Sequence, residues 1–201
     1  MQNNKVEISG CVTQQPMASH YIYGEMFYTF PVEVTRLSGN IDSLPVLVPG
    51  RLLEHRPVAA GQGVWIMGQL RSYNRIVEGA SRLELKVFAR QLRPFEGGEC
   101  VNRICLCGYL CKPPVYRKTP FGREIADLLV AVNRAYDRSD YIPAIAWGQN
   151  ARRSAGRGVG SKLSLEGRIQ SRDYEKHLPD GKGEVRRTYE VSIFDMQFEE
   201  E

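Results

Sequence analysis

Histidine and cysteine, the side chains that most often hold metal ions, are scarce in this sequence. It has three histidines and five cysteines, and the cysteines are odd in number with no C-x-x-C pair. Neither a disulfide framework nor a zinc motif is therefore indicated. Cys105, Cys107 and Cys111 lie along a segment with a strand pattern, in which alternate residues share one face. Without a turn, sulfurs so arranged cannot surround one ion tetrahedrally. We interpret the cysteines as small buried hydrophobic residues and expect no metal and no cofactor.

Catalytic motifs and long apolar runs are absent as well. The sequence has no G-x-S-x-G and no H-E-x-x-H, and its glycine-rich run 156–160 lacks the Lys-Ser/Thr ending of a phosphate loop. Without an acid, a base and a nucleophile in one pattern, we do not expect an enzyme. No apolar run approaches the roughly 18 residues that span a bilayer, and residues 1–10 lack the apolar core of a signal peptide. We expect a cytoplasmic protein with no membrane partner.

Arginine, in contrast, is abundant. Lysine and arginine together number 27 against 23 acidic residues, a formal net charge of +4, and 20 of the 27 are arginines. The guanidinium group offers a planar donor fork for phosphates and a face that stacks on bases. The bias favours a nucleic-acid partner, although a solvated surface that uses arginine gives the same composition.

The sequence also contains an internal repeat. Asp42–Gly50, D-S-L-P-V-L-V-P-G, returns 98 residues later as Asp140–Gly148, D-Y-I-P-A-I-A-W-G. The same offset aligns these identical residues without a gap: Gly10 with Gly108, Pro16 with Pro114, Gly24 with Gly122, Val32 with Val130, Val34 with Val132, Arg36 with Arg134, Asp42 with Asp140, Pro45 with Pro143 and Gly50 with Gly148.

Beyond this span the second copy gains residues. One is added before Gly68 aligns with Gly167, and two more before Arg71-Ser72-Tyr73 aligns with Arg172-Asp173-Tyr174. The repeat predicts two domains, 1–99 and 100–201, and the short junction 94–100 places them close together.

Each copy has the pattern of a small β-barrel. In the first, we expect strands over 5–13, 26–37, 44–48, 63–73 and 83–92, a helical segment within 50–60, a turn-rich stretch after residue 13 and a turn over 74–82. The prolines that bound the third strand favour a position near a sheet edge. Five strands with a short helix between strands 3 and 4 predict an all-β protein of two tandem OB-fold Greek-key barrels. An immunoglobulin-like sandwich has similar strands but needs a Cys…Trp…Cys frame, which is missing.

Aromatic residues interleave with basic ones in the second copy. Tyr141 and Trp147 are six residues apart and so share one side of a strand, while Ile142, Ala144 and Ala146 take the other. Because only one side can face the core, we expect the uniformly apolar side to be buried there. Single-stranded nucleic acid needs flat rings for bases and cations for phosphates. The candidate binding residues are Tyr136, Tyr141, Trp147, Tyr174, Arg134, Arg168, Arg172, Lys162 and Lys112. Core packing is the alternative for any single aromatic.

A series of motifs in the second copy resembles a known family. In order they are N-R-I-C-L-C-G-Y-L from Asn102, K-x-P from Lys112, T-P-F-G from Thr119, L-V-A-V-N-R ending at Arg134, A-W-G around Trp147 and E-G-R-I-Q-S-R-D-Y ending at Tyr174. Over residues 102–198 this looks like the bacterial single-stranded DNA-binding protein (SSB) family. The resemblance implies an OB-fold that wraps DNA over aromatic platforms, with stacking positions at Tyr136, Tyr141, Trp147 and Tyr174. It also implies an assembly of four barrels.

The first copy resembles the family less closely. It keeps Arg71 and Tyr73 in G-Q-L-R-S-Y, with Trp65 just before, and these join the candidate binding residues. At the positions that align with Tyr136, Tyr141 and Trp147, it has Ser38, Ser43 and Pro49, so three of the stacking rings are missing. This domain therefore binds DNA weakly, serves as an assembly partner, or uses other rings, namely Tyr21, Tyr23, Phe27 and Tyr28.

The resemblance leads to a functional expectation. We expect sequence-independent binding and protection of single-stranded DNA in replication, repair or recombination, by a homodimer that supplies four OB-folds. Typical family members continue into an acidic tail that recruits replication and repair proteins. Here Phe198-Glu199-Glu200-Glu201 follows the last expected strand directly, so we expect a form without that tail. The alternatives are an OB-fold primosome or assembly accessory protein and a single-stranded RNA binder.

Overall fold

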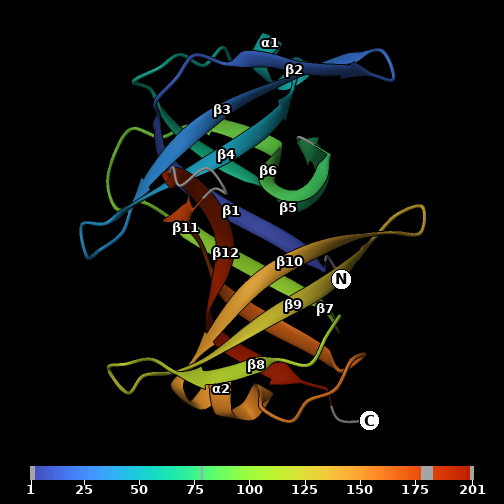
Figure 1. Ribbon diagram of the computed structural model, residues 1–201. Helices are drawn as coiled ribbons and strands as arrows, with labels where there is room; N and C mark the ends of the chain where they lie inside the picture. The colour runs from blue at the N-terminus through green and yellow to red at the C-terminus, as the bar shows by residue number, and fades with distance from the viewer. Residues whose placement is uncertain (1–2, 78, 178–182, 200–201) are drawn as a thin grey trace.

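The computed structural model describes residues 3–77, 79–177 and 183–199, in which twelve strands form one continuous sheet (Figure 1). The first half contains β1 (Asn4–Val12), β2 (Met17–Ile22), β3 (Glu25–Thr35), β4 (Ile41–Pro49), α1 (Gly50–His55), β5 (Gly63–Val77) and β6 (Ala80–Pro94). The second contains β7 (Asn102–Leu110), β8 (Val115–Lys118), β9 (Glu124–Arg134), β10 (Arg138–Trp147), α2 (Gly148–Ser154), β11 (Lys162–His177) and β12 (Gly183–Phe198).

The sheet closes on itself twice. In the first half β1 pairs with β3, β3 with β4, β4 in parallel with β6, β6 with β5, and β5 again with β1. β7, β9, β10, β12 and β11 repeat this order. Each half is thus a closed five-stranded barrel with a helix after its third strand, so the prediction of two tandem OB-folds is confirmed. Alternate residues of the barrel strands, such as Val6, Ile8, Val130 and Val132, fill the cores.

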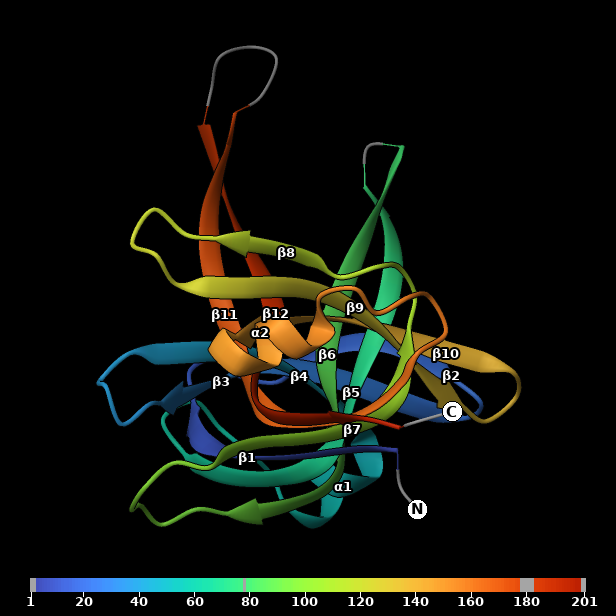
Figure 2. The ribbon, with the colours of Figure 1, turned by 90° about the horizontal axis from the view of Figure 1, so that it is seen from below.

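Three local expectations were wrong. The turn-rich stretch after residue 13 contains β2, a sixth strand that pairs with β3, and β8 has the same place beside β9. The strand β4 is not at an edge but lies between β3 and β6. Its parallel register with β6 involves only Val46 and Leu47, so the flanking prolines need not donate hydrogen bonds there. The turn expected over 74–82 is mostly strand, because β5 and β6 continue as a long hairpin beyond the barrel (Figure 2).

The cysteines also differ from expectation. Cys105 and Cys107 lie on β7 as predicted, but they are half-buried and face outward, while Ile104 and Leu106 take the core positions. Cys11 is exposed. Within the described ranges no three His, Cys, Asp or Glu side chains gather into a group able to hold a metal ion. No helix there has the length and apolar character needed to span a membrane.

The two barrels join through their first strands. β1 pairs antiparallel with β7 from Asn4 opposite Leu106 to Ile8 opposite Asn102, and Figure 1 shows these strands between the barrels. Asn4 exchanges side-chain hydrogen bonds with the backbone of Leu70, and Asn102 does the same with Ile169. Because both halves carry the same contacts, Leu70 and Ile169 are equivalent.

This equivalence corrects the alignment of the repeat. Leu70 and Ile169 differ by 99, so Arg71 corresponds to Gln170 and Ser72 to Ser171. The expected match of Arg71-Ser72-Tyr73 with Arg172-Asp173-Tyr174 was therefore wrong. The extra residues of the second copy fall farther along the hairpin, outside the barrel, where added length does not disturb the sheet.

The glycines of the first strands allow a close approach that a side chain would prevent. A Cβ on Gly108 would lie 2.3 Å from the carbonyl oxygen of Ala131 on β9, and one on Gly10 would lie 2.1 Å from that of Glu33 on β3. At both positions the first strand crosses from one neighbour to the next, so the barrel closes over a residue without a Cβ.

We expect Gly108→Ala to lower the free energy of unfolding by about 1–3 kcal/mol, because β7 and β9 must separate to admit the methyl group. Chemical denaturation measures this. Gly158→Ala is the control, since a Cβ there would meet no atom within 4 Å, and it should leave stability unchanged or slightly raised. Equal stabilities of the two variants would contradict a steric requirement at Gly108.

Candidate nucleic-acid interface

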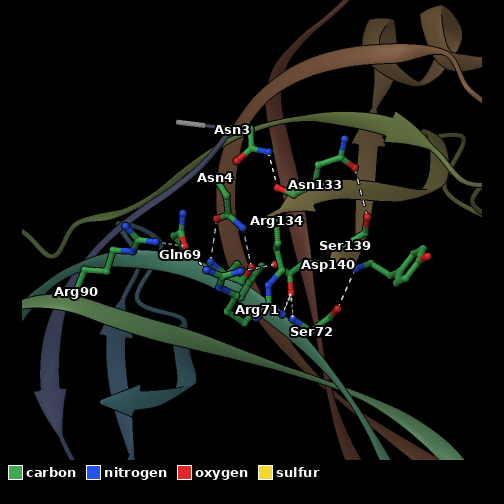
Figure 3. Close-up of polar contacts among 12 residues, drawn as sticks. Asn3, Asn4, Gln69, Arg71, Ser72, Arg90, Asn133, Arg134, Ser139 and Asp140 are labelled. Atoms are coloured by element: carbon green, nitrogen blue, oxygen red, sulfur yellow. Dashed lines mark hydrogen bonds and ion pairs between the residues drawn. The ribbon is translucent and has the colours of Figure 1, made fainter. Parts of the chain in front are cut away.

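The junction between the barrels contains a fully buried carboxylate, Asp140, near the start of β10. It accepts a 2.8 Å hydrogen bond from the backbone N–H of Ser72 on β5, in the other barrel. Arg71, also of the other barrel, and Arg134 each donate to it at 3.2 Å (Figure 3). Two of the candidate phosphate-binding arginines thus point at a carboxylate within the protein.

Asp42 of the first barrel makes the equivalent contact with the second barrel. It is fully buried, accepts a 2.8 Å hydrogen bond from the backbone N–H of Ser171, and pairs with Arg36 through two hydrogen bonds of 2.6 and 2.5 Å. The hydroxyls complete the symmetry, because Ser171 accepts from the N–H of Ser43 and Ser72 accepts from that of Tyr141. Each barrel therefore bonds to the other through one buried aspartate, and the arginine that pairs with it recurs as well, as Arg36 and Arg134.

The two halves of the junction differ in one arginine. Arg71 has Gln170 as its equivalent, and Gln170 bonds to Glu190 instead of the neighbouring barrel. Burial, followed by the positive charge of Arg134, lowers the pKa of Arg71. Burial likewise raises the pKa of Tyr73, which is half-buried beside these groups. The structure thus places Arg71, Tyr73 and Arg134 together at the junction.

The aromatic residues of β10 lie on the outer face of the second barrel. Tyr141 is 45% exposed and Trp147 is 38% exposed, whereas Ile142, Ala144 and Ala146 are buried in the core, as their alternation predicts. The indole N–H of Trp147 donates to the hydroxyl of Ser192 on β12 at 3.2 Å. That hydrogen bond fixes the ring while leaving part of it open to solvent.

The other two aromatic candidates lie outside this strand. Tyr136 is 94% exposed in the turn from β9 to β10 and has a φ of +63°, which fits a tight hairpin turn. Tyr174 lies on β11 and lines a groove of about 750 Å³ together with Pro143, an outward residue of β10 between Tyr141 and Trp147. Pro45, the equivalent of Pro143, lines the same groove, as do Leu85 of the first long hairpin and Arg187 of the second. The groove therefore lies between the two long hairpins, whose ribbons are drawn in Figure 2.

Two basic candidates share the outer face of β11 with Tyr174. Arg168 and Arg172 are separated from it by even numbers of residues, so all three point the same way. Arg168 lies opposite Ser192 in the β11–β12 register and its guanidinium group is 5.5 Å from the ring centroid of Phe194. Burial lowers the pKa of Arg168, and its Nε is buried without a hydrogen-bond partner among the described residues.

The remaining candidates lie apart from this face or are engaged. Lys162, at the start of β11, forms a 2.7 Å ion pair with Glu199, and Lys112 is exposed in the turn after β7. Trp65 on β5 donates from its indole N–H to Glu7 at 3.0 Å and is covered by Arg93, 5.1 Å from the ring centroid.

The sequence reasoning missed two residues on the outer face, Ser192 and Phe194. Phe194 is exposed and sits at a bulge in the β11–β12 pairing. The alternation of the last strand, in which Val191 and Ile193 are buried, could have identified both as outward residues.

Comparison with known proteins shows which family the second half of the sequence matches. The model of the single-strand binding protein family matches residues 101–199. Single-stranded DNA-binding protein 3 of Clostridium acetobutylicum is 32% identical over 106 residues, which cover 49% of this chain and 70% of that protein. The chain belongs to the single-strand binding protein family.

Other relatives in the family are matched over a smaller share. Single-stranded DNA-binding protein 2 of Listeria innocua is 37% identical over 89 residues, 41% of this chain and 55% of that protein. The chain thus spans about half the length of several relatives. A crystal structure of a deletion mutant of the single-stranded DNA-binding protein from Thermus aquaticus matches with a TM-score of 0.77 at 24% identity. It covers 98% of this chain and 95% of that one, so the likeness of fold extends over both barrels.

We expect Asp140→Asn to lower the free energy of unfolding by about 1–3 kcal/mol, because a neutral amide leaves Arg71 and Arg134 without their opposite charge. The arginines are 14% and 27% exposed, so water offsets part of the loss. Asp127→Asn is the control: its ion pair with Arg117 at 3.0 Å is exposed and should be worth less than about 1 kcal/mol. Equal losses in denaturant titrations would contradict a special role for the buried carboxylate.

Proposed function

We propose that this protein binds single-stranded DNA with little sequence preference and protects it in replication, repair or recombination. The observation that supports this most is the outer face of the second barrel. There Tyr141 and Trp147 are half-exposed along β10, and Arg168 and Arg172 lie on β11. Its relatives in Listeria innocua and Clostridium acetobutylicum are named single-stranded DNA-binding proteins, which supports the same ligand.

The exposed aromatic rings of this face suit single-stranded DNA of any sequence. Every base has a flat π-face, so stacking on an aromatic ring gives about 1–3 kcal/mol per base without selecting a sequence. Trp147 is held by Ser192, so little side-chain entropy is lost when a base stacks on it. We propose stacking roles for Tyr136, Tyr141, Trp147 and Tyr174. The protein then acts by binding alone, and not as an enzyme.

The cations divide into two roles under this proposal. Arg168 and Arg172 contact phosphates beside the aromatic face. Lys112, in the turn after β7, and Lys162, which pairs with Glu199, contact phosphates farther from it. Arg71 and Arg134, whose guanidinium groups bond to Asp140, act first in holding the barrels together, with Tyr73 packed beside them. Trp65, covered by Arg93, has the weakest support as a stacking residue.

We further propose that residues 1–99 and 100–201 are the two domains and that two chains form a homodimer with four barrels. The closed β-barrel of each half supports the first statement, and the resemblance to the family supports the second. Replication or repair proteins are the partners that such an assembly would serve. Sedimentation of the protein alone tests the dimer.

We expect Trp147→Ala to weaken binding of a labelled oligo-dT by about 5- to 150-fold, which corresponds to the loss of one stacked base. Fluorescence anisotropy of the oligonucleotide measures this without relying on the tryptophan. Trp147→Phe should retain most of the affinity, and Phe121→Ala, in the exposed turn between β8 and β9, should match wild type. An unchanged affinity of Trp147→Ala would remove the central stacking assignment.

Affinity should fall with salt, because each neutralised phosphate of a single strand contributes a slope of about −0.7 in log K against log salt. Arg172→Ala should make that slope shallower by about 0.7, whereas Arg117→Ala, whose guanidinium already pairs with Asp127, should leave it unchanged. Matched RNA and duplex DNA of the same length serve as competitors. Tighter binding of either one would contradict single-stranded DNA as the preferred ligand.

A further inference from the structure

The outer face around Trp147 has an equivalent on the first barrel, and the strand registers align the two residue by residue. In the second barrel Trp147 pairs with Ile125 on β9, and Ile145 pairs with Ser192 on β12. In the first, Pro49 pairs with Phe27 on β3, and Leu47 pairs with Phe88 on β6. Pro49 therefore corresponds to Trp147, Phe27 to Ile125, and Phe88 to Ser192.

This alignment shows that the first barrel keeps aromatic rings on this face but carries them on different strands. Proline replaces Trp147, while phenylalanines replace its neighbours Ile125 and Ser192. The rings of Phe27 and Phe88 have centroids 6.1 Å apart and are tilted by 35°. The ring of His20, on β2, stacks on Phe27 at 5.0 Å with an interplanar angle of 8°. We call His20, Phe27 and Phe88 the aromatic row.

The aromatic row is not part of the hydrophobic core. Phe30 on β3 and Val87 on β6 point inward from the strands of the two phenylalanines, and Val48 points inward from β4 between them; all three are almost completely buried and fill the barrel beneath. Phe27 and Phe88 point the other way and are only partly buried, and His20 is exposed. Packing of the barrel interior therefore does not explain three rings in succession on its outer face.

The arginine of this face is also on a different strand in each barrel: Arg168 is on β11, whereas Arg90 is on β6, the equivalent of β12. Where the second barrel has Arg168 beside Phe194, the first has Gln69 beside Arg90, and Phe194 and Arg90 both occupy the bulge of their hairpin. Arg90 is exposed and donates to Gln69 at 2.9 Å (Figure 3). The guanidinium group of Arg71 lies 5.9 Å from the ring centroid of Phe88. Each face thus combines aromatic rings with an arginine, which lies at the β-bulge in the first barrel and beside it in the second.

We propose that the aromatic row, with Arg90, is a second stacking surface for single-stranded nucleic acid on the first barrel. The proposal rests on the proposed function of the second barrel. Its ligand is the same strand: bases stack on Phe27 and Phe88, His20 extends the row, and Arg90 contacts a phosphate. Both barrels then bind nucleic acid. Because their aromatic rings are at different positions of the repeat, an alignment of identical residues does not reveal the second surface.

The test replaces the two phenylalanines of the row with the residues that the second barrel carries at the same positions, Ile125 and Ser192. The double variant Phe27→Ile, Phe88→Ser should occlude fewer nucleotides of poly-dT per chain. It should also bind a dT oligomer long enough to cross both barrels at least about 5-fold more weakly, as expected for one lost stacked base. Adding Pro49→Trp transfers the arrangement of the second barrel and should restore both values. Leu37→Ser, in the exposed turn between β3 and β4, is the surface control and should match wild type.

The outcomes separate the two proposals. If the wild-type protein fails to bind oligo-dT, the proposed function fails whatever the row does. If wild type binds and Trp147→Ala weakens binding, while the double variant keeps wild-type affinity and occluded length, the row is overturned and the proposed function stands.

Should the double variant unfold, ultraviolet crosslinking of oligo-dT to the wild-type protein decides. Crosslinked peptides containing Phe27 or Phe88 support the row, and crosslinks confined to the second barrel overturn it.

Discussion

The reciprocal burial of Asp42 and Asp140 is the constraint on which the arrangement of this protein depends. Each carboxylate leaves water only because a backbone N–H of the opposite barrel and at least one arginine bond to it. A buried charge without such partners costs several kcal/mol. The barrels therefore have one favourable orientation, which also aligns β1 with β7 and sets the groove between the two long hairpins.

This constraint determines which basic residues remain for a ligand. Arg71 and Arg134 belong to motifs that resemble a nucleic-acid binder, yet their guanidinium groups meet a carboxylate at the junction. Arg168 and Arg172 lie on the outer face of β11 instead. The family motifs thus combine residues that hold the fold together with residues on the outer face, and the motif alone does not separate them.

Duplication preserved the frame of each barrel more strictly than the residues on its outer face. The junction aspartates, the glycines at the crossing of the first strand and the asparagines that bond to the neighbouring strand all recur. Trp147 does not recur, but Phe27 and Phe88 stand on either side of its equivalent, Pro49. A repulsive or unsatisfied group in the core is costly, whereas a ring on the surface can move to a neighbouring strand and still be available for stacking.

The sequence alone determined the fold class, the repeat and the exposed side of β10, because strand alternation and turn residues are local signals. It also indicated the repeated Arg36–Asp42 and Arg134–Asp140, which are close in the chain. Only the tertiary structure decided that Ser72 matches Ser171, that Arg71 reaches the opposite barrel, and that Phe27 lies against Phe88. The reason is physical: these contacts join residues far apart in the sequence, and they exist only once the strands pair and the barrels close.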